Sequence, residues 1–418
     1  MDDVDVVIVG AGLAGLRAAR DLADRGRRVV VLEARDRVGG RGYSVRLGDR
    51  LVELGGSWFT PDHDEVRSEL DRYGLAVRDY PPIEHARWFT AGELRLGLPV
   101  PWPELEALEH ALARVAADAR AVAAGDRTVA ALSAAEYVDS MRPPPALRDF
   151  LLGWWQLMGG APPDRGAAVD ALAAIAEHGG LTGLLTCLAH GPVDGWSALA
   201  GSLADSPGVA VRLACRVAGI EQRPDGVTCL LADGTEVTAR AAVVAVPLNC
   251  LPGIAFSPAL PERARVAPGT NVGAAVKLLM LARNVPAHGI AVGVGSGMNW
   301  LYADEHRDGE TLVIGFGWDD PEFDPADTAQ VAAALSDFYP DAELVAVTRH
   351  DWIADPASLG TWLTAPAGRL ELVDPARFEP VDRIVFAGSD FAHEQAGWFE
   401  GALRSGAAAA GYVDDRLG

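Results

Sequence analysis

Residues 6–15 read VVIVGAGLAG, an apolar run that leads directly into three glycines. An alanine-rich stretch follows, and the next apolar run ends at Glu33. Gly10 permits a tight turn, Gly12 lets the backbone approach a pyrophosphate, and Gly15 lets a helix pack closely on a strand. The helix N-terminus offers N–H groups to phosphates, and Glu33 can accept from ribose hydroxyls. The stretch therefore predicts a β-α-β unit that binds a dinucleotide, although alone it also fits a turn in an ordinary α/β domain and leaves NAD, NADP and FAD open.

Size, charge and cysteine content limit the class of protein. A chain of 418 residues exceeds one ordinary core, so we expect two domains. No apolar run approaches the roughly 18 residues of a membrane helix, and the N-terminus is acidic, so we expect neither a membrane span nor a secretory leader. The net charge of −22 disfavours nucleic acid. The four cysteines lack zinc-like spacing, which predicts reduced thiols in a cytoplasmic protein without a metal site.

Two further glycine pairs follow the first unit. Residues 34–41 read ARDRVGGR, in which the glycines free the backbone and Arg41 can pair with phosphate oxygens in a bidentate manner. Residues 53–59 read ELGGSWF, a composition that suits a loop running along a flat ring system. Taken alone, the first motif also fits a basic surface loop and the second a strand-end turn.

Later patterns predict a largely helical insertion followed by strands. Apolar residues recur at helical spacing over 105–122, and Ser133 with Glu136 fits a capping box. Trp154 and Trp155 lie in a helical stretch and fit either a helix core or a substrate cavity. The remaining predictions are strands over 6–9, 28–32, 209–213, 216–220, 227–231, 236–238, 242–246 and 311–316, a turn over 232–235 and a helix over 325–338.

Together with two later motifs, these stretches resemble the flavin-containing amine oxidase superfamily, which includes monoamine oxidases, polyamine oxidases and L-amino-acid oxidases. The later motifs are an internal lysine, Lys277, and residues 384–406, which read IVFAGSDFAHEQAGWFEGALRSG. The resemblance implies an α/β fold in which a Rossmann-like FAD-binding domain is interleaved with an α+β substrate-binding domain. It assigns 1–80, 206–285 and 376–418 to the FAD-binding domain, and 81–205 and 286–375 to the substrate-binding domain.

The resemblance also implies how FAD is held. Thr361 stands where some members carry the cysteine that bonds to flavin, so we expect non-covalent FAD. Val217 matches a position whose backbone meets adenine, and Trp352 matches a tryptophan at the benzenoid end of flavin. Asp390 is one methylene shorter than the family's usual glutamate, so its reach to the cofactor is reduced. The residues predicted to bind FAD are Gly10, Gly12, Leu13, Ala14, Gly15, Glu33, Ala34, Arg35, Gly40, Arg41, Gly55, Gly56, Ser57, Trp58, Val217, Trp352, Gly388, Ser389, Asp390, Gly397, Trp398 and Ala402.

Lys277 lies in a stretch that is apolar on both sides, so a charged side chain there needs a reason. In the family the matching lysine lies near flavin N5 and holds a water. Such a lysine favours the negative charge of reduced flavin and promotes its reaction with O2. The alternative is an edge-strand lysine whose ammonium reaches solvent.

Trp398 matches an aromatic residue that faces the flavin and forms a cage with a second aromatic. Spacing to Gly368 places the second position at Thr364, whereas Trp362 lies two residues away and on the same face if the segment is extended. The predicted catalytic residues are therefore Lys277, Trp398, Thr364 and Trp362. Arg87 is a candidate for binding the carboxylate of an amino-acid substrate.

The resemblance implies an FAD-dependent oxidase of a small-molecule amine. A neutral amine transfers a hydride to flavin N5, the imine hydrolyses to an aldehyde or ketone and ammonia, and O2 reoxidises the flavin to give H2O2. The alternatives are an L-amino-acid oxidase, an FAD-dependent desaturase of a biosynthetic intermediate and, least favoured, a non-redox flavoprotein. The expected partners are the amine and O2, and the choice between a monomer and a homodimer stays open.

Overall fold

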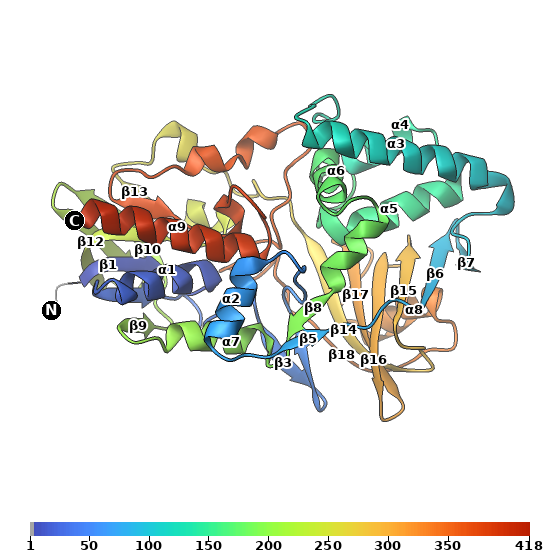
Figure 1. The fold of residues 1–418 in the computed structure, drawn as a ribbon, viewed down its shortest axis with the longest axis horizontal. Helices are drawn as coiled ribbons and strands as arrows, with labels where there is room; N and C mark the ends of the chain where they lie inside the picture. Colours follow the sequence, from blue (N-terminus) through green and yellow to red (C-terminus); the bar gives the residue numbers. More distant parts are fainter. Residues whose placement is uncertain (1–3) are drawn as a thin grey trace.

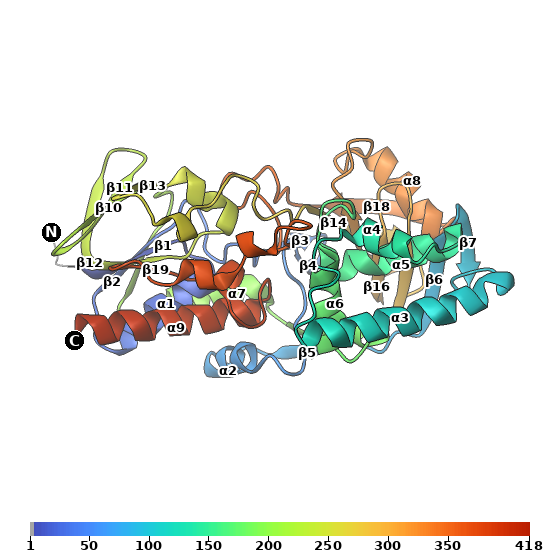
Figure 2. The ribbon, with the colours of Figure 1, turned by 90° about the horizontal axis from the view of Figure 1, so that it is seen from above.

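The computed structural model describes residues 4–418, which form two lobes side by side (Figures 1 and 2). The first lobe is built on an eight-stranded sheet with the order β13-β10-β11-β12-β1-β2-β9, and β19 also pairs with β12. Its strands come from both ends and the middle of the chain. They are β1 (Val4–Val9), β2 (Val29–Leu32), β9 (Val209–Arg212), β10 (Val217–Arg223), β11 (Gly226–Leu231), β12 (Glu236–Val244), β13 (Ala255–Ser257) and β19 (Ile384–Phe386).

The predicted β-α-β unit lies at the centre of this sheet. β1 pairs in parallel with β2 on one side and with β12 on the other, and α1 (Leu13–Asp24) connects β1 to β2. Both faces of β1 are covered, which explains its continuous apolar sequence. β12 is one nine-residue strand, where the sequence predicted separate strands over 236–238 and 242–246, because its two ends pair with different neighbours, β11 and β19.

Helices α1, α7 (Gly195–Ala204) and α9 (Phe399–Leu417) pack together against one face of the first sheet and share an apolar cluster with it. α2 (Asp64–Arg72) packs against α9, and the buried Glu400 carboxylate accepts hydrogen bonds from the first N–H groups of α2. A Cβ at Gly406 would lie 2.3 Å from the Ala14 carbonyl oxygen, so α9 can approach α1 this closely only with glycine at that point. The C-terminal helix thereby completes the lobe that the N-terminal strand begins.

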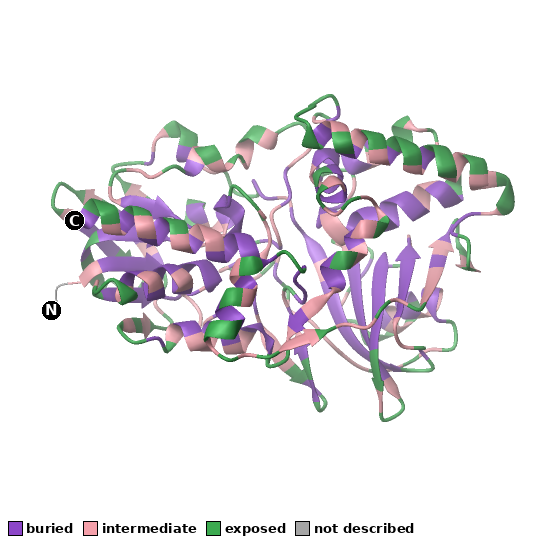
Figure 3. Cartoon of the chain, in the orientation of Figure 1, coloured by how far each residue is buried: buried purple, intermediate pink, exposed green. Residues whose placement is uncertain are grey.

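The second lobe is built on a seven-stranded sheet with the order β18-β14-β17-β16-β15-β6-β7. Helices α3 to α6 lie over one face, with α5 packed on β15 and β6, and α8 covers the other face (Figures 1 and 2). The strands of both sheets are largely buried (Figure 3). The elements are β6 (His85–Thr90), β7 (Glu93–Leu96), α3 (Leu105–Ala123), α4 (Ala134–Ser140), α5 (Pro145–Gly159), α6 (Ala168–Glu177), β14 (Ala275–Arg283), β15 (Gly289–Gly293), β16 (Trp300–Arg307), β17 (Glu310–Trp318), α8 (Thr328–Phe338) and β18 (Glu343–Thr348).

Most of the helices and strands predicted for the second lobe are present. α3, α8 and β17 match their predicted ranges closely, and the capping box of Ser133 and Glu136 begins α4. Trp154 and Trp155 are buried on α5 among core residues and do not line the cavity described below, so the core interpretation is the right one. Two short ladders, β3 (Ser44–Leu47) with β4 (Arg50–Glu53) and β5 (Val77–Asp79) with β8 (His190–Pro192), complete the strands.

The structure differs from the predicted segment boundaries at two places. β14 belongs to the second sheet, so the middle segment of the first lobe ends before Ala275 and not at residue 285. α7 packs on α1, so it belongs with the first lobe although the sequence assigned its residues to the second. Sequence patterns show strands and helices but not which sheet a strand joins, and this explains both differences.

Within residues 4–418, no single helix has both the length and the apolar composition needed to cross a membrane. α6 and the 3₁₀ segment η2 (Thr182–Leu188) meet that composition only as a pair, and they are bent by 80° at the break between them.

Candidate functional site

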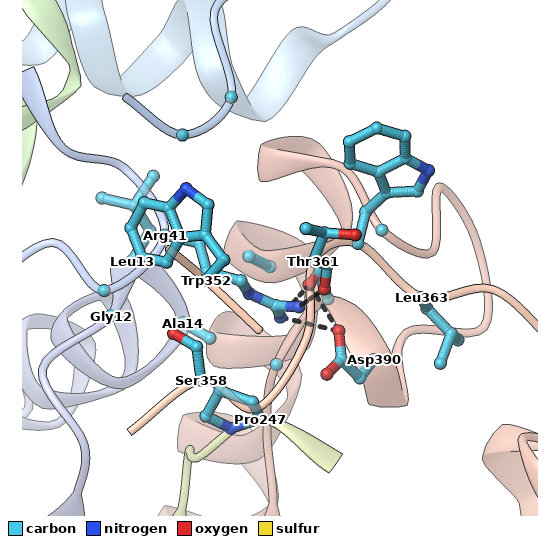
Figure 4. Close-up of a pocket in the computed structure, with 18 of the residues that line it drawn as sticks. Gly12, Leu13, Ala14, Arg41, Pro247, Trp352, Ser358, Thr361, Leu363 and Asp390 are labelled. Atoms are coloured by element: carbon cyan, nitrogen blue, oxygen red, sulfur yellow. Dashed lines mark hydrogen bonds and ion pairs between the residues drawn. The ribbon is translucent and has the colours of Figure 1, made fainter. Parts of the chain in front are cut away.

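A cavity of about 490 Å³ runs from the first sheet to the helices of the second lobe. Figure 4 shows part of its lining, including Gly12, Arg41 and Trp352. All residues that the sequence predicted to bind FAD line it, except Gly15. Three of the four predicted catalytic residues, Lys277, Trp362 and Trp398, line it as well. We call the part lined by α1 and the glycine loops the FAD groove. We call the other part the substrate chamber, which is lined by Leu157, Met158, Asp170, Ala173, Ala174, Glu177, Trp362, Gln395 and Trp398.

The first glycine turn has the geometry that a pyrophosphate requires. Gly10 has a φ of +105°, and a Cβ at Gly15 would lie 2.1 Å from the Gly10 carbonyl oxygen. Around Gly12, by contrast, a Cβ would meet no described atom within 4 Å, so that side of the turn is open. The open side lies at the start of α1, where the unpaired N–H groups of the first turn favour a phosphate. Gly15 therefore serves helix packing, and Gly12 leaves room for the cofactor.

Glu33 is fixed at the end of β2 by two backbone groups. Its Oε2 accepts a hydrogen bond from the Ala11 N–H at 2.7 Å, and its Oε1 accepts one from the Arg35 N–H at 2.9 Å. The carboxylate is buried at the wall of the FAD groove. These contacts orient an acidic group where the predicted ribose would lie.

Arg41 connects three separated segments at the floor of the groove. It donates to the Thr361 carbonyl oxygen at 2.7 Å, to Ser389 Oγ at 2.8 Å and to Asp390 Oδ1 at 2.6 Å (Figure 4). Asp390 Oδ2 accepts from the Leu248 N–H at 3.0 Å, so both oxygens of this carboxylate are bound within the protein. The shorter side chain of Asp390 thus holds Arg41, while a direct contact of either residue with FAD stays a prediction.

The second glycine pair is required by the protein itself. A Cβ at Gly56 would lie 2.5 Å from the Phe399 ring, and one at Gly55 would lie 1.7 Å from the Arg41 carbonyl oxygen. Trp352 donates from Nε1 to the Leu54 carbonyl oxygen at 2.9 Å and lines the groove beside this loop. The loop is therefore clamped against α9, where a flat ring system can lie along it.

Lys277 lies on β14, between β17 and β18, and is 5% exposed. The alternative of an edge-strand lysine that reaches solvent is therefore wrong. Its Nζ donates to the carbonyl oxygens of Glu53 and Gly55, at 2.7 and 2.6 Å, and to Ser57 Oγ at 2.6 Å. Lys277 is also the only lysine in the 418-residue sequence.

The protonation of Lys277 is shifted by its surroundings. Burial lowers its pKa to about 7, and the opposite charge of Glu53 acts against this shift. Burial in turn raises the pKa of Glu53. Glu53 Oε1 accepts from Ser44 Oγ and the Trp196 N–H, whereas its buried Oε2 has no hydrogen-bond partner among the described residues. A lysine whose pKa lies close to neutral pH can change protonation state during turnover.

Two tryptophans bound the substrate chamber. Trp362 donates from Nε1 to the Met158 carbonyl oxygen at 3.0 Å, and its ring lies 6.3 Å from that of Phe316, which also flanks Lys277. A Cβ at Gly397 would lie 3.5 Å from Trp362 Cβ, so the segment that carries Trp398 packs directly on Trp362. The two predicted aromatic walls therefore meet at one chamber.

The prediction that Thr364 shares a face with Trp362 is wrong. Thr364 is 1% exposed, does not line the cavity, and donates from Oγ1 to the Gly159 carbonyl oxygen at 3.0 Å. The segment is not an extended strand, so the alternation on which the prediction depended does not apply. Trp362 takes the wall position, and Thr364 fixes the segment from behind.

Two carboxylates in the chamber were missed by the sequence analysis. Asp170 and Glu177 lie seven residues apart on one face of α6, with Ala173 and Ala174 between them, and all four line the chamber. Burial raises the pKa of Asp170 to about 6 and also raises that of Glu177. Acids at this spacing in an otherwise apolar helix were the available signal, but the sequence does not say what that helix faces.

Each carboxylate is held by a contact at the chamber wall. Asp170 Oδ2 accepts from the Ala365 N–H at 2.7 Å, next to the Trp362 segment. Glu177 Oε1 accepts from Gln395 Nε2 at 2.7 Å, and Gln395 Oε1 lies 3.2 Å from His63 Nε2. The His63 ring in turn packs against Trp398 at 5.3 Å. The chamber therefore combines apolar walls with two anionic groups.

Arg87, the candidate for a substrate carboxylate, lies elsewhere. It points toward α8, where it donates to the Phe338 carbonyl oxygen and covers the Tyr339 ring at 4.8 Å. It does not line the cavity. The cationic side chains among the described lining residues are Arg35, Arg41, Arg216 and Lys277, all of them in or beside the FAD groove.

Known proteins resemble this chain over nearly its whole length. (S)-6-hydroxynicotine oxidase from Paenarthrobacter nicotinovorans is 34% identical over 96% of this chain and 97% of its own length. Pseudooxynicotine dehydrogenase from Pseudomonas sp is 27% identical over 97% of this chain and 85% of its own length. Among solved structures, wild-type putrescine oxidase bound to putrescine has the same fold, with a TM-score of 0.85, 23% sequence identity and 99% of both chains covered.

The sequence model described as flavin containing amine oxidoreductase matches residues 13–414, which include the FAD groove from the start of α1 onward but not Gly10 and Gly12. The FAD groove, Lys277 and the two tryptophans lie in one cavity. The structure and the comparisons therefore both indicate a flavin-dependent amine oxidase. The chain belongs to the flavin-containing amine oxidoreductase family.

Proposed function

We propose that this chain, an FAD-dependent oxidase of small-molecule amines, acts on an amine that carries a second basic nitrogen. The observation that carries the proposal is the pair of carboxylates, Asp170 and Glu177, on the face of α6 that lines the substrate chamber. An ammonium group gains from a nearby carboxylate most where water is partly excluded. The carboxylates therefore favour a substrate with a cationic group at a distance from the carbon that is oxidised.

FAD supplies the electron acceptor for the carbon–hydrogen bond next to nitrogen. The residues of the groove fit this group, because Gly12 leaves open space at the start of α1 and the Glu33 carboxylate, held by the Ala11 N–H, lines the same cavity. The rings of Trp362 and Trp398 orient the amine and exclude water. Lys277 lines the same cavity, with its Nζ held at Ser57 of the second glycine loop.

The composition of the chamber disfavours an amino-acid substrate. The carboxylate of an amino acid needs a cationic partner, and Arg87 lies outside the cavity. Asp170 and Glu177 would repel that carboxylate. The relatives also favour an amine over an amino acid as the substrate. Hydroxynicotine and putrescine, named in two of them, each contain two nitrogens and no carboxylate.

The test uses two substrates of equal size, butane-1,4-diamine and pentan-1-amine, which differ in one terminal group. Each is mixed anaerobically with the FAD-loaded protein, and the loss of flavin absorbance is followed. We expect the diamine to reduce the flavin about 10-fold more efficiently, which corresponds to roughly 1.4 kcal/mol of added attraction. Faster reduction by the monoamine would contradict the role of the carboxylates, and no reduction by any amine would contradict amine oxidation itself.

A further inference from the structure

The environment of Lys277 suits both of its protonation states. A lysine ammonium donates three hydrogen bonds, and Nζ has three oxygens around it, from Glu53, Gly55 and Ser57. A neutral amine donates two and accepts one. The two carbonyl oxygens can only accept, so the one partner able to donate to neutral Lys277 is the Ser57 hydroxyl.

Ser57 has a free proton when Lys277 is charged. In that state Ser57 Oγ accepts from Nζ at 2.6 Å, and its own hydrogen has no hydrogen-bond acceptor among residues 4–418. Ser57 lines the cavity, so this hydrogen can point into it. When Lys277 is neutral, the hydrogen bond between Ser57 and Nζ runs in the opposite direction.

Amine oxidation needs a place to keep one proton. The overall reaction, R₂CH–NH₃⁺ + O₂ → R₂C=NH₂⁺ + H₂O₂, takes up no net proton. However, the substrate ammonium must lose its proton before the carbon–hydrogen bond is broken, because the nitrogen electron pair forms the new C=N bond. Later, the hydride equivalent and O₂ need one proton to form H₂O₂. The proton is therefore released early and used late.

We propose that Ser57 relays this proton between the cavity and Lys277, so that Lys277 stores it between the two halves of the reaction. On loading, Ser57 receives a proton from the cavity side and passes its own to the lone pair of neutral Lys277. On release, Ser57 takes a proton from the Lys277 ammonium and gives its own to the reduced oxygen. Each shift reverses the direction of the hydrogen bond between Ser57 and Lys277 and leaves both carbonyl contacts in place. The proposal rests on the amine oxidase function described above.

The groups around Lys277 are consistent with this role. Glu53 is the carboxylate that interacts with it, and its negative charge stabilises the stored proton. Trp58 and Phe316, whose rings lie 5.7 and 5.6 Å from Nζ, carry no titratable group. Tyr80 packs edge-on against Trp58, and burial raises the pKa of its phenol, so it stays neutral. Lys277 itself lines the cavity, but all three hydrogen-bond partners of its Nζ belong to the protein, so the proton reaches Nζ by way of Ser57.

The single lysine makes the stored proton directly observable. Protein labelled with ¹³C at lysine Cε and ¹⁵N at Nζ gives NMR signals from Lys277 alone, because the sequence contains no other lysine. In the oxidised FAD-loaded protein, we expect these signals to titrate with a midpoint near 7. A lysine that stays charged from pH 6 to pH 10 would overturn the proposal without any variant.

The relay itself is tested with Ser57→Ala, with Ser57→Thr as the control that keeps the hydroxyl. Enzyme reduced with dithionite is mixed with O2, so no amine is needed and a failure of the proposed function does not affect the result. We expect Ser57→Ala to slow reoxidation on the order of 10²-fold and to lower the Lys277 midpoint, and Ser57→Thr to restore both. Reoxidation of Ser57→Ala within about twofold of wild type, with an unchanged midpoint and pH profile, would show that Ser57 only fills space.

Discussion

The FAD groove and the substrate chamber share one cavity but are built from different parts of the chain. The groove is formed mainly by backbone: glycine turns, the start of α1 and a loop clamped against α9. The chamber is formed by side chains of α5, α6 and two connecting segments. The difference shows that cofactor binding depends on how closely the backbone can approach FAD. Substrate choice depends on which side chains line the substrate chamber.

The largest effect is expected for Gly15→Ala, in the first turn of α1 next to the FAD groove. The added Cβ would lie 2.1 Å from the Gly10 carbonyl oxygen, so the turn before α1 must move. We expect a loss of about 3 kcal/mol in the free energy of unfolding and protein that purifies without FAD. The ratio of flavin absorbance to protein absorbance measures this loss.

The matched control is Gly411→Ala, which also lies inside a helix, α9, but where a Cβ would meet no described atom within 4 Å. It should retain FAD and gain roughly 0.5–1 kcal/mol. Equal FAD content in the two variants would contradict the claim that the groove depends on close backbone packing.

The next largest effect is expected for the aromatic walls of the chamber. Trp362→Ala and Trp398→Ala should each lower kcat/KM on the order of 10²-fold while FAD content stays unchanged, because the rings orient the amine and not the pyrophosphate. Trp362→Phe keeps an aromatic wall and should recover most of the activity. Loss of FAD from Trp362→Ala would show that groove and chamber are not separable.

A smaller effect is expected for the carboxylates of α6. The double variant Asp170→Asn with Glu177→Gln should lose the roughly 10-fold preference for butane-1,4-diamine over pentan-1-amine and keep its activity on the monoamine. The two variant residues are isosteric with the originals, so the measurement isolates charge. If the double variant keeps the preference for the diamine, the second nitrogen of the substrate does not bind at these carboxylates.

The same preference should depend on pH in the wild-type protein. Burial raises the pKa of Asp170 to about 6, so its carboxylate is charged above that value and becomes neutral as the pH falls through it. We therefore expect discrimination between diamine and monoamine to weaken from pH 7 to pH 5. The double variant, which has neither acid, serves as the control and should show no such change.

The smallest effect is expected for Thr364→Val, which keeps the shape of the side chain but removes its hydrogen bond to the Gly159 carbonyl oxygen. We expect a loss of about 1 kcal/mol in stability and less than about threefold change in kcat/KM. A loss of activity as large as that of Trp362→Ala would mean that Thr364 forms part of the wall of the substrate chamber. Thermal unfolding and steady-state kinetics give the two values.

The groove could be predicted from the sequence because its residues are local motifs whose spacing has a mechanical reason. Gly10, Gly12 and Gly15 each have the surroundings that their predicted roles require. Lys277 could be singled out for a similar physical reason, since a charged side chain in an apolar strand needs a polar partner. The residues that hold Arg41, by contrast, come from segments about 320 to 349 positions away, which no local pattern indicates.

The chamber could be predicted only in part. Trp398, just before α9, was predicted from the family resemblance of its segment. The choice between Trp362 and Thr364, by contrast, depended on the backbone of an irregular segment. Asp170 and Glu177 were missed because helical spacing shows that they share a face and does not show what the face packs against. For the same reason, the sequence assigned β14 and α7 to the wrong lobes.

The central claim is that the chamber selects amines without a carboxylate and delivers them to the flavin. It is tested most directly by anaerobic mixing of the FAD-loaded protein with 2-phenylethylamine and with phenylalanine, which differ only in the carboxylate. Rapid-mixing absorbance then gives the rate of flavin reduction for each compound. We expect the amine to bleach the flavin and the amino acid to leave it oxidised. Reduction by phenylalanine at an equal or greater rate would contradict it.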